Sequence, residues 1–290
     1  MTGTQSQAGS SYWTSTGLPV ALLLVAMLSF QVGASIAKSL FPLVGPIGVV
    51  AIRVALGATV LWITTRPWVA AKRPQASRAL IVYGVSMGLM NLFFYAALDR
   101  IPQGVAVAVE FIGPLAVAIV SSHRPIDFVW IAIASAGLIL LLPVKHIGSA
   151  GDLYGIVLAL AAGACWAIYI VSGQRAGAQH GMQVTAFGSL IAASIVVPLG
   201  IVKVGHALFA GSVLIPGLLV AILSTAIPYA LEMVALTRLN ARTFGVLMSL
   251  EPVLGALSAY AWLGEGLTAR QWLAIALVMT SSAGATLGSR

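Results

Sequence analysis

Charged side chains are scarce in this sequence. They make up 8% of the 290 residues, whereas 60% are hydrophobic, and the mean hydropathy is +1.02. A soluble domain carries about 25% charged residues, so this chain has too few to cover a water-facing surface. Its apolar runs are long and continuous, which excludes the alternating segments of roughly ten residues in a transmembrane β-barrel. The composition therefore predicts an all-α membrane protein.

The residues of metal, redox and nucleotide chemistry are also few. Cys165 is the single cysteine, which excludes an intramolecular disulfide. The four histidines fall in or beside different loops, without the spacing of metal ligands. The sequence has no phosphate-binding P-loop, no Gly-x-Ser-x-Gly elbow and no His-Glu-x-x-His motif. We therefore expect no cofactor, no metal and no enzymatic activity, and any transport must be driven by an ion gradient or by the solute's own gradient.

Basic residues outnumber acidic ones, 15 to 7, for a net charge of +8. They are scattered over short loops rather than gathered into a patch, so we expect no nucleic-acid partner. Such charges set the topology of a membrane protein, because cytoplasmic loops are richer in Lys and Arg. Counted along the chain, the bias predicts that both termini are cytoplasmic, chiefly through the basic loop before Ala79.

Ten apolar runs follow one another, each near the roughly 20 residues that a bilayer requires. Residues 1–17 before them are small and polar, without a Lys or Arg, which predicts a frayed tail and a retained first helix rather than a signal peptide. The runs are Leu18–Ala37, Ile47–Thr65, Ala79–Leu98, Gln103–Ser121, Asp127–Pro143, Leu153–Ser172, Met182–Val202, Val213–Leu236, Arg242–Leu263 and Gln271–Gly288.

The chain contains an internal repeat. Arg100–Pro114 and Arg238–Pro252 each begin with Arg, contain a carboxylate and end with Pro, and a shift of 138 residues superposes them. The shift predicts a first repeat over 18–145 and a second over 146–290. Five helices per repeat is an odd number, so the second copy must enter the membrane from the opposite side. The prediction is therefore ten transmembrane helices in two inverted five-helix repeats, the architecture of many secondary transporters.

Four charged residues fall inside the expected helices: Arg53, Glu110, Glu232 and Glu251. A charge at the membrane centre costs about 2.5–3.5 kcal/mol on insertion scales, so such residues are functional by default. Glu110 and Glu251 lie near the middle of their helices. Glu232 lies nearer the cytoplasmic end and Arg53 about two turns from the outer end, so these two side chains could instead extend to the interface.

Helical spacing gathers polar residues into stripes beside these charges. Gly84, Gly88, Asn91 and Tyr95 share one face, as do Thr225, Tyr229 and Glu232 on a later helix. Further candidates are Gln31, Trp166 and Tyr169. Tyr and Trp are also frequent in packing and in interfacial belts, and the small faces favour close helix packing. Both interpretations stay open for these residues.

The second copy contains Leu250-Glu251-Pro252 and Leu263-Gly264-Glu265, whereas the first copy has Gly113-Pro114 without the Glu. With ten expected helices in two inverted copies, the sequence resembles the EamA family of the drug/metabolite transporter superfamily, whose signature the two motifs of the second copy match. Ser121–Asp127 also stands where Leu-Gly-Glu is often found. These departures from the signature, together with several longer blocks of sequence, resemble one branch of the family that exports amino acids. The blocks are Gly33–Gly45, Glu110–Ala118, Gly163–Tyr169, Ser172–Gly177 and Ala221–Ala226.

The resemblance implies an exporter in the bacterial inner membrane that moves small hydrophilic amino acids, L-threonine and L-homoserine above all. Its expected partners are the amino-acid substrate, protons and the lipid bilayer. Alternatives are an exporter of another metabolite, such as a different amino acid or a nucleoside, and a non-transporting membrane receptor or assembly subunit. An intramembrane enzyme is a weaker third alternative, because no catalytic constellation is present.

A zwitterionic substrate needs partners for both its charges once water is removed. We expect Glu110 or Glu251 to face the ammonium, Asn91 and Tyr229 to bond the hydroxyl or carboxylate, and Trp166 to close the apolar side. Arg53 is a candidate partner for the carboxylate. The full set of expected substrate-binding residues is Gln31, Asn91, Tyr95, Glu110, Trp166, Tyr169, Tyr229 and Glu232.

Proton coupling is expected at Glu251, with Glu110 and Glu232 as further candidates. Desolvation between apolar helices favours the protonated form of a carboxyl group. A proton and a substrate ammonium cannot neutralise one carboxylate together, and this exclusivity would make their exchange obligatory. Pro252 beside Glu251 has no N–H and loosens the helix locally.

Overall fold

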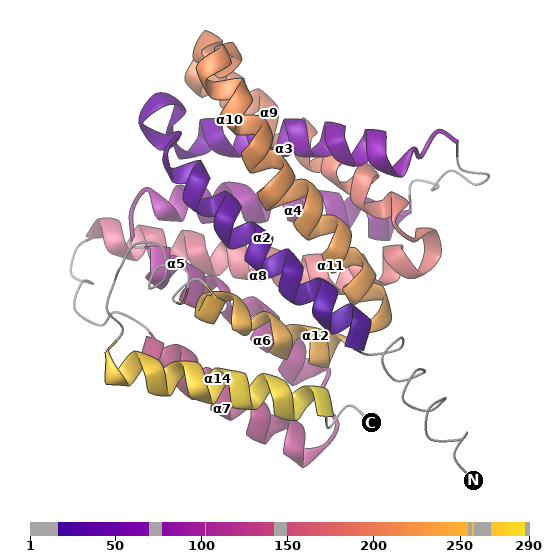
Figure 1. Ribbon diagram of the computed structural model, residues 1–290, viewed down its shortest axis with the longest axis vertical. Helices are drawn as coiled ribbons and strands as arrows, with labels where there is room; N and C mark the ends of the chain where they lie inside the picture. The colour runs from indigo at the N-terminus through magenta and orange to yellow at the C-terminus, as the bar shows by residue number, and fades with distance from the viewer. Residues whose placement is uncertain are drawn as a thin grey trace, which may run out of the picture.

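The structure is a computed structural model that describes residues 17–69, 77–101, 103–141, 150–254, 257 and 268–287. Throughout these ranges the secondary structure is helix and turn, without a strand. The helices pack side by side in one bundle, with α7 and α14 along one edge (Figure 1). This confirms the all-α prediction for the described part of the chain.

The helices of the N-terminal half begin and end close to the expected apolar runs. They are α2 (Leu18–Lys38), α3 (Phe41–Thr65), α4 (Arg78–Leu98), α5 (Gln103–Glu110), α6 (Ile112–Val120) and α7 (Pro125–Leu141). The expected tail, residues 1–17, lies outside the described residues except for Gly17.

The C-terminal half follows the same order of elements. It contains α8 (Ala150–His180), α9 (Gln183–Val204), η2 (Gly205–Phe209), α10 (Gly211–Ala221), η3 (Ile222–Ala226), α11 (Ile227–Arg238), α12 (Ala241–Met248) and α14 (Ala269–Leu287), with a further helical stretch at 250–254. Most of the expected run after Met248, and Glu265 of the family signature, lie outside the described residues.

Five of the described helical segments are long and apolar enough to cross a bilayer. They are Phe41–Thr65, Arg78–Leu98, Leu153–His180, Gln183–Phe209 and Gly211–Arg238, and shorter apolar helices cover Leu18–Ala34, Ala106–Val120 and Pro125–Leu140. Large apolar side chains also point outward from the bundle. Val120, Val202 and Ile215 are 82%, 87% and 78% exposed, a surface that suits lipid rather than water. The chain is therefore a multi-pass membrane protein.

The start of α3 differs from the expectation. The expected run begins at Ile47, but α3 begins at Phe41, includes Pro42 and Pro46, and changes direction at Gly45. Gly45 has φ +64° and ψ 171°, a conformation that only glycine adopts without strain. Each proline then lies in the first turn of a helical piece, where its missing N–H costs nothing.

The expected helix over Gln103–Ser121 is interrupted at Phe111, which separates α5 from α6. Pro114 explains the interruption, because it has no N–H to bond the carbonyl of Glu110 one turn earlier. The second half repeats this feature 138 residues later, with an interruption at Ser249 and Pro252 three residues beyond it. The two helix breaks therefore follow from the repeated proline.

An ion pair joins the starts of α7 and α12. Arg242 Nη1 lies 2.6 Å from Asp127 Oδ1, and both side chains are largely buried. Asp127 Oδ2 also accepts the backbone N–H of Arg124 at 3.1 Å, just before α7 begins. Asp127 thus stabilises the first turn of α7 and ties it to a helix from the other half of the sequence.

A tight backbone contact between helices lies beside the α5–α6 break. A Cβ atom added at Gly163 on α8 would lie 2.5 Å from the carbonyl oxygen of Glu110, and one added at Gly113 would collide with the backbone of Gly163. Because backbone faces backbone here, no side-chain rotation can relieve the contact.

Gly163→Ala should therefore lower the stability of the protein by about 1–3 kcal/mol, the cost of overpacking a tight interface. The measurement is thermal unfolding of the detergent-purified protein. Gly211→Ala is the matched control, because a Cβ at Gly211 meets nothing within 4 Å. A Gly163→Ala protein that melts with the parent would contradict this account of the α5–α8 contact.

Candidate functional site

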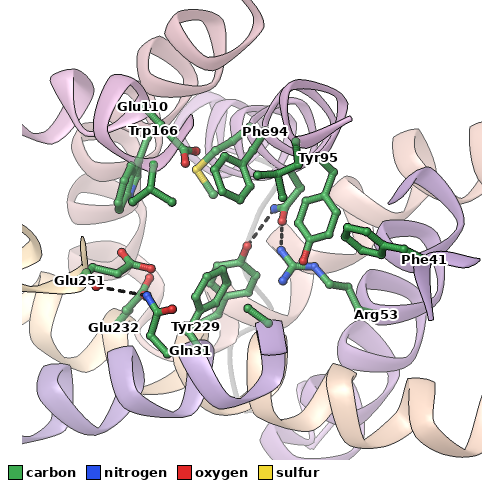
Figure 2. A pocket seen from close by; sticks show the side chains of 16 residues that line it. Gln31, Phe41, Arg53, Phe94, Tyr95, Glu110, Trp166, Tyr229, Glu232 and Glu251 are labelled. Atoms are coloured by element: carbon green, nitrogen blue, oxygen red, sulfur yellow. Dashed lines mark hydrogen bonds between the residues drawn. The ribbon is translucent and has the colours of Figure 1, made fainter. Parts of the chain in front are cut away.

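A small cavity lies in the middle of the bundle (Figure 2). Its free space is about 70 Å³, and since a buried water requires roughly 10–15 Å³, it corresponds to about five water molecules. Helices from both halves of the sequence contribute to the wall. The lining residues are Phe30, Gln31, Ala34, Phe41, Arg53, Met90, Asn91, Phe94, Tyr95, Leu98, Val107, Glu110, Trp166, Tyr229, Glu232 and Glu251.

Arg53 on α3 provides the cation of the cavity. Its side chain is 1% exposed, so the guanidinium cannot extend to the membrane interface. One terminal nitrogen donates to Asn91 Oδ1 and the other to the carbonyl of Ser224 at 3.4 Å. The guanidinium carbon also lies 4.8 Å from the ring centre of Tyr95 and 5.5 Å from that of Phe30, within the range of cation–π attraction.

The carbonyl that receives Arg53 is exposed by an irregular helix. Pro228 has no N–H, and the preceding residues Ile222–Ala226 form a wide π-helical turn. Carbonyl groups of this turn are bonded from other helices instead. Leu223 O accepts from Ser29 Oγ of α2 at 2.7 Å, and Ser224 O accepts from Arg53. The proline and the wide turn therefore create an acceptor for a buried cation.

Asn91 on α4 connects Arg53 to the second half of the chain. Its amide nitrogen donates to the hydroxyl of Tyr229 and to the carbonyl of Met87, each at 2.8 Å, while its oxygen accepts from Arg53. These three bonds fix the orientation of the amide. They also fix Tyr229 of α11 at the centre of the cavity, as Figure 2 shows.

The acidic side of the cavity is formed by Glu110, Glu232 and Glu251. Glu110 and Glu232 are 7% and 8% exposed. Glu232 Oε2 accepts the hydroxyl of Tyr169 at 3.1 Å, and the backbone carbonyl of Glu251 accepts from Gln31 Nε2 at 3.2 Å. In Figure 2, Glu232 and Glu251 lie on the side of the cavity away from Arg53.

The Arg53 guanidinium and the three carboxyl groups line the same cavity, but they form no ion pair with one another in the described part of the chain. Within the described ranges, no salt bridge joins Arg53 to Glu110, Glu232 or Glu251. A guanidinium is a good partner for a carboxylate, and a carboxylate for an ammonium. The unfilled space between them therefore matches a small molecule that carries both charges.

Most of the expected site residues meet at this cavity. Those that line it are Gln31, Arg53, Asn91, Tyr95, Glu110, Trp166, Tyr229, Glu232 and Glu251. Tyr169 lies behind the wall, where it stacks on Tyr83 with ring centres 4.8 Å apart and donates to Glu232. The alternative that Arg53 and Glu232 extend to the interface is wrong, because both side chains are buried.

Three members of the expected stripes face other helices. Gly84 and Gly88 lie against Gly188, Ile191 and Ala192 of α9, so this small face packs helices together. Thr225 lies against Gly57 of α3. A stripe indicates which residues share a direction, but not whether a cavity or a neighbouring helix lies there.

Sequence reasoning missed the apolar lining, formed by Phe30, Ala34, Phe41, Met90, Phe94, Leu98 and Val107. One signal was available on α4, where Phe94 and Leu98 follow Asn91 at helical spacing. The ring centre of Phe41 lies 6.1 Å from that of Tyr95, edge to face. No comparable signal marked Phe41, which precedes the glycine break of α3.

Metal ligation has no support in the part of the chain that the structure describes. No three His, Cys, Asp or Glu side chains come together there as a group of metal ligands.

The chain is similar to known transport proteins over most of its length. The model of the EamA-like transporter family matches residues 153–287. Threonine/homoserine exporter RhtA of Escherichia coli (strain K12) is 56% identical over 273 residues, which cover 94% of this chain and 92% of that protein. The protein of the same name from Salmonella typhimurium (strain LT2) is 53% identical over 282 residues, which cover 97% and 96%.

A solved crystal structure has the same fold. It superposes with a TM-score of 0.80 at 22% identity and covers 95% of this chain and 99% of its own. The two curated relatives are exporters rather than enzymes by name, in agreement with the resemblance that the sequence blocks carry. With relatives this similar over almost its whole length, the chain belongs to the EamA-like transporter family.

Proposed function

We propose that this protein exports L-threonine and L-homoserine from the cytoplasm across the bacterial inner membrane. The observation that carries the proposal is its 56% identity, over 94% of the chain, to a threonine/homoserine exporter. Membership of a transporter family speaks against a receptor or an assembly subunit. The cavity offers an independent argument about the substrate.

The cavity suits a small zwitterion with a short polar side chain. Arg53 is available to a carboxylate at one side, and the three glutamates to an ammonium at the other. Asn91 and Tyr229 lie beside Arg53, where the Tyr229 hydroxyl, which accepts from Asn91, can donate to a substrate carboxylate or hydroxyl, and the Asn91 oxygen can accept from a hydroxyl. About 70 Å³ of free space is far below the roughly 300–1,000 Å³ of drug-sized sites, which favours an amino acid over a nucleoside.

The fold behind this function is ten membrane spans in two inverted repeats, 18–145 and 146–290. Asn91 and Tyr229 are 138 residues apart, and they bond each other. Equivalent residues of a two-fold arrangement touch only near its axis, so this bond supports an axis through the cavity. The helix breaks at Phe111 and Ser249 share the same spacing.

The packing of the helices supports the same arrangement. In the proposed repeats, α2 corresponds to α8, and α4 corresponds to the stretch that ends in α11. The contact between α4 and α8 should therefore have a counterpart between α11 and α2, and both contacts are present. The α3–α9 and α7–α14 contacts each pair a helix with its own equivalent. Five spans per repeat make the repeats antiparallel in the membrane, with both termini in the cytoplasm.

A count of charges in the cavity supports proton coupling. The wall contains three carboxyl groups and one guanidinium, so ionisation of all three would leave uncompensated negative charge in a poorly solvated space. Such charge is costly unless a cation neutralises it. We infer that protons and the substrate ammonium take this role in turn, with Glu251 as the coupling residue beside Pro252.

The topology is testable by reporter fusions. Fusions at Gln75 and Ala150 should report opposite compartments, because three expected spans, an odd number, separate the two positions. A fusion at Gly288 should agree with the one at Gln75. The same compartment for Gln75 and Ala150 would exclude the ten-span inverted arrangement.

Glu110→Gln keeps the volume of the side chain and removes its charge. Because a hydrogen bond to a charged group contributes about 1.5–3 kcal/mol, half-saturation of transport should require at least about tenfold more homoserine. Cells that produce the variant should also be less protected from excess homoserine. Asp99→Asn, an exposed carboxylate outside the cavity, should protect as well as the parent. Full protection by Glu110→Gln would exclude Glu110 as a substrate ligand.

Glu251→Gln separates coupling from binding. In liposomes the variant should still exchange labelled threonine at equal concentrations on both sides, but should no longer accumulate it when a pH gradient is imposed. Accumulation falls to the passive level because glutamine cannot exchange a proton for an ammonium. Asp99→Asn should retain both activities, and pH-driven accumulation by Glu251→Gln would contradict the coupling role.

A further inference from the structure

A second hollow lies on the flank of the bundle, separate from the central cavity. It is a groove of about 760 Å³ between α4, α6 and α8, and it shares no lining residue with the central cavity. Its volume is within the roughly 300–1,000 Å³ of small-molecule sites. The groove is lined by Arg78, Ala79, Val82, Ala116, Val117, Val120, Ser121, Ala167, Ile168, Val171, Ser172 and Arg175.

Two arginines from different helices stand at the groove. Arg78 is the first residue of α4, and Arg175 lies in the last third of α8. Both side chains are exposed, and within the described ranges neither forms a salt bridge with an acidic residue. The positive end of the α4 dipole adds to the attraction for an anion. This end of the groove therefore favours a negatively charged group.

The rest of the groove is apolar and open to the side. Val120, Ile168 and Val171 are 82%, 48% and 38% exposed, and in a membrane protein such surfaces contact acyl chains. Ala116 and Ala167 leave space between these larger side chains. A free anion gains nothing from such walls, whereas an acyl chain buries its methylene groups against them at about 0.8 kcal/mol each.

We propose that the groove between α4, α6 and α8 binds an anionic phospholipid, with the phosphate between Arg78 and Arg175 and an acyl chain along Val120, Ile168 and Val171. Basic pockets between membrane helices are known to bind anionic headgroups on the cytoplasmic side. The lipid connects α4 of the first half to α8 of the second. Its binding therefore stabilises the packing of these two helices and is independent of the transported substrate.

The test is native mass spectrometry of the detergent-purified protein, titrated with phosphatidylglycerol or phosphatidylcholine. Phosphatidylglycerol should bind the parent more tightly than phosphatidylcholine. Arg78→Gln with Arg175→Gln should weaken phosphatidylglycerol binding about thirty-fold, given the contribution of each basic residue near an anionic lipid surface. Ala116→Leu, which fills the groove without changing charge, should also weaken it.

The matched control is Arg66→Gln with Arg238→Gln, which removes two exposed arginines outside the groove. This variant should bind phosphatidylglycerol like the parent. Equal loss in both double variants would mean general charge attraction and would overturn the proposal. Competition by inorganic phosphate at the lipid's own concentration, or unchanged binding by Ala116→Leu, would exclude the acyl-chain contact and overturn it as well.

Discussion

A guanidinium buried among membrane helices is the constraint on which the centre of this protein depends. Arg53 is 1% exposed and must find its bonding partners inside the bundle. Asn91 provides one acceptor, and Tyr229 and Met87 hold that amide in place. A backbone carbonyl of η3 provides the other, and it is available because Pro228 lacks an N–H. The need to bond this one guanidinium therefore explains Asn91 on α4, and Pro228 and Tyr229 on α11.

The helices could be predicted from the sequence because a continuous apolar run long enough to cross a bilayer can satisfy its backbone hydrogen bonds there only as a helix. The predicted starts and ends of α2, α4, α9 and α14 are within two residues of the structure. Interruptions within helices could not be located in the same way. Pro114 and Pro46 each remove one helical hydrogen bond. The chain nevertheless changes direction only at Gly45, where glycine allows φ +64°, whereas Phe111 keeps helical dihedral angles, with φ −62° and ψ −14°.

The charged and amide residues of the site could be predicted because each is expensive in a membrane and needs a reason to be there. The apolar lining could not be predicted, because 60% of the chain is hydrophobic and nothing distinguishes a cavity-lining phenylalanine from one that packs in the core or faces lipid. The stripe on α4 identified Asn91 and Tyr95, which line the cavity, whereas its Gly84 and Gly88 lie against α9. Those glycines were correctly expected to allow close packing, and the sequence does not say that α9 is their partner.

The packing of the bundle also explains why the two proposed repeats carry their glutamates at different positions. The second copy has Glu251 before its proline, whereas the first has Gly113. A side chain at Gly113 would collide with the backbone of Gly163, so this position cannot accommodate a glutamate while α6 and α8 touch. A carboxylate in the first copy must therefore lie elsewhere on the helix, and Glu110, almost one turn earlier, faces the cavity. The repeated proline interrupts both helices, and the close backbone contact at Gly163 determines where the first copy can carry its charge.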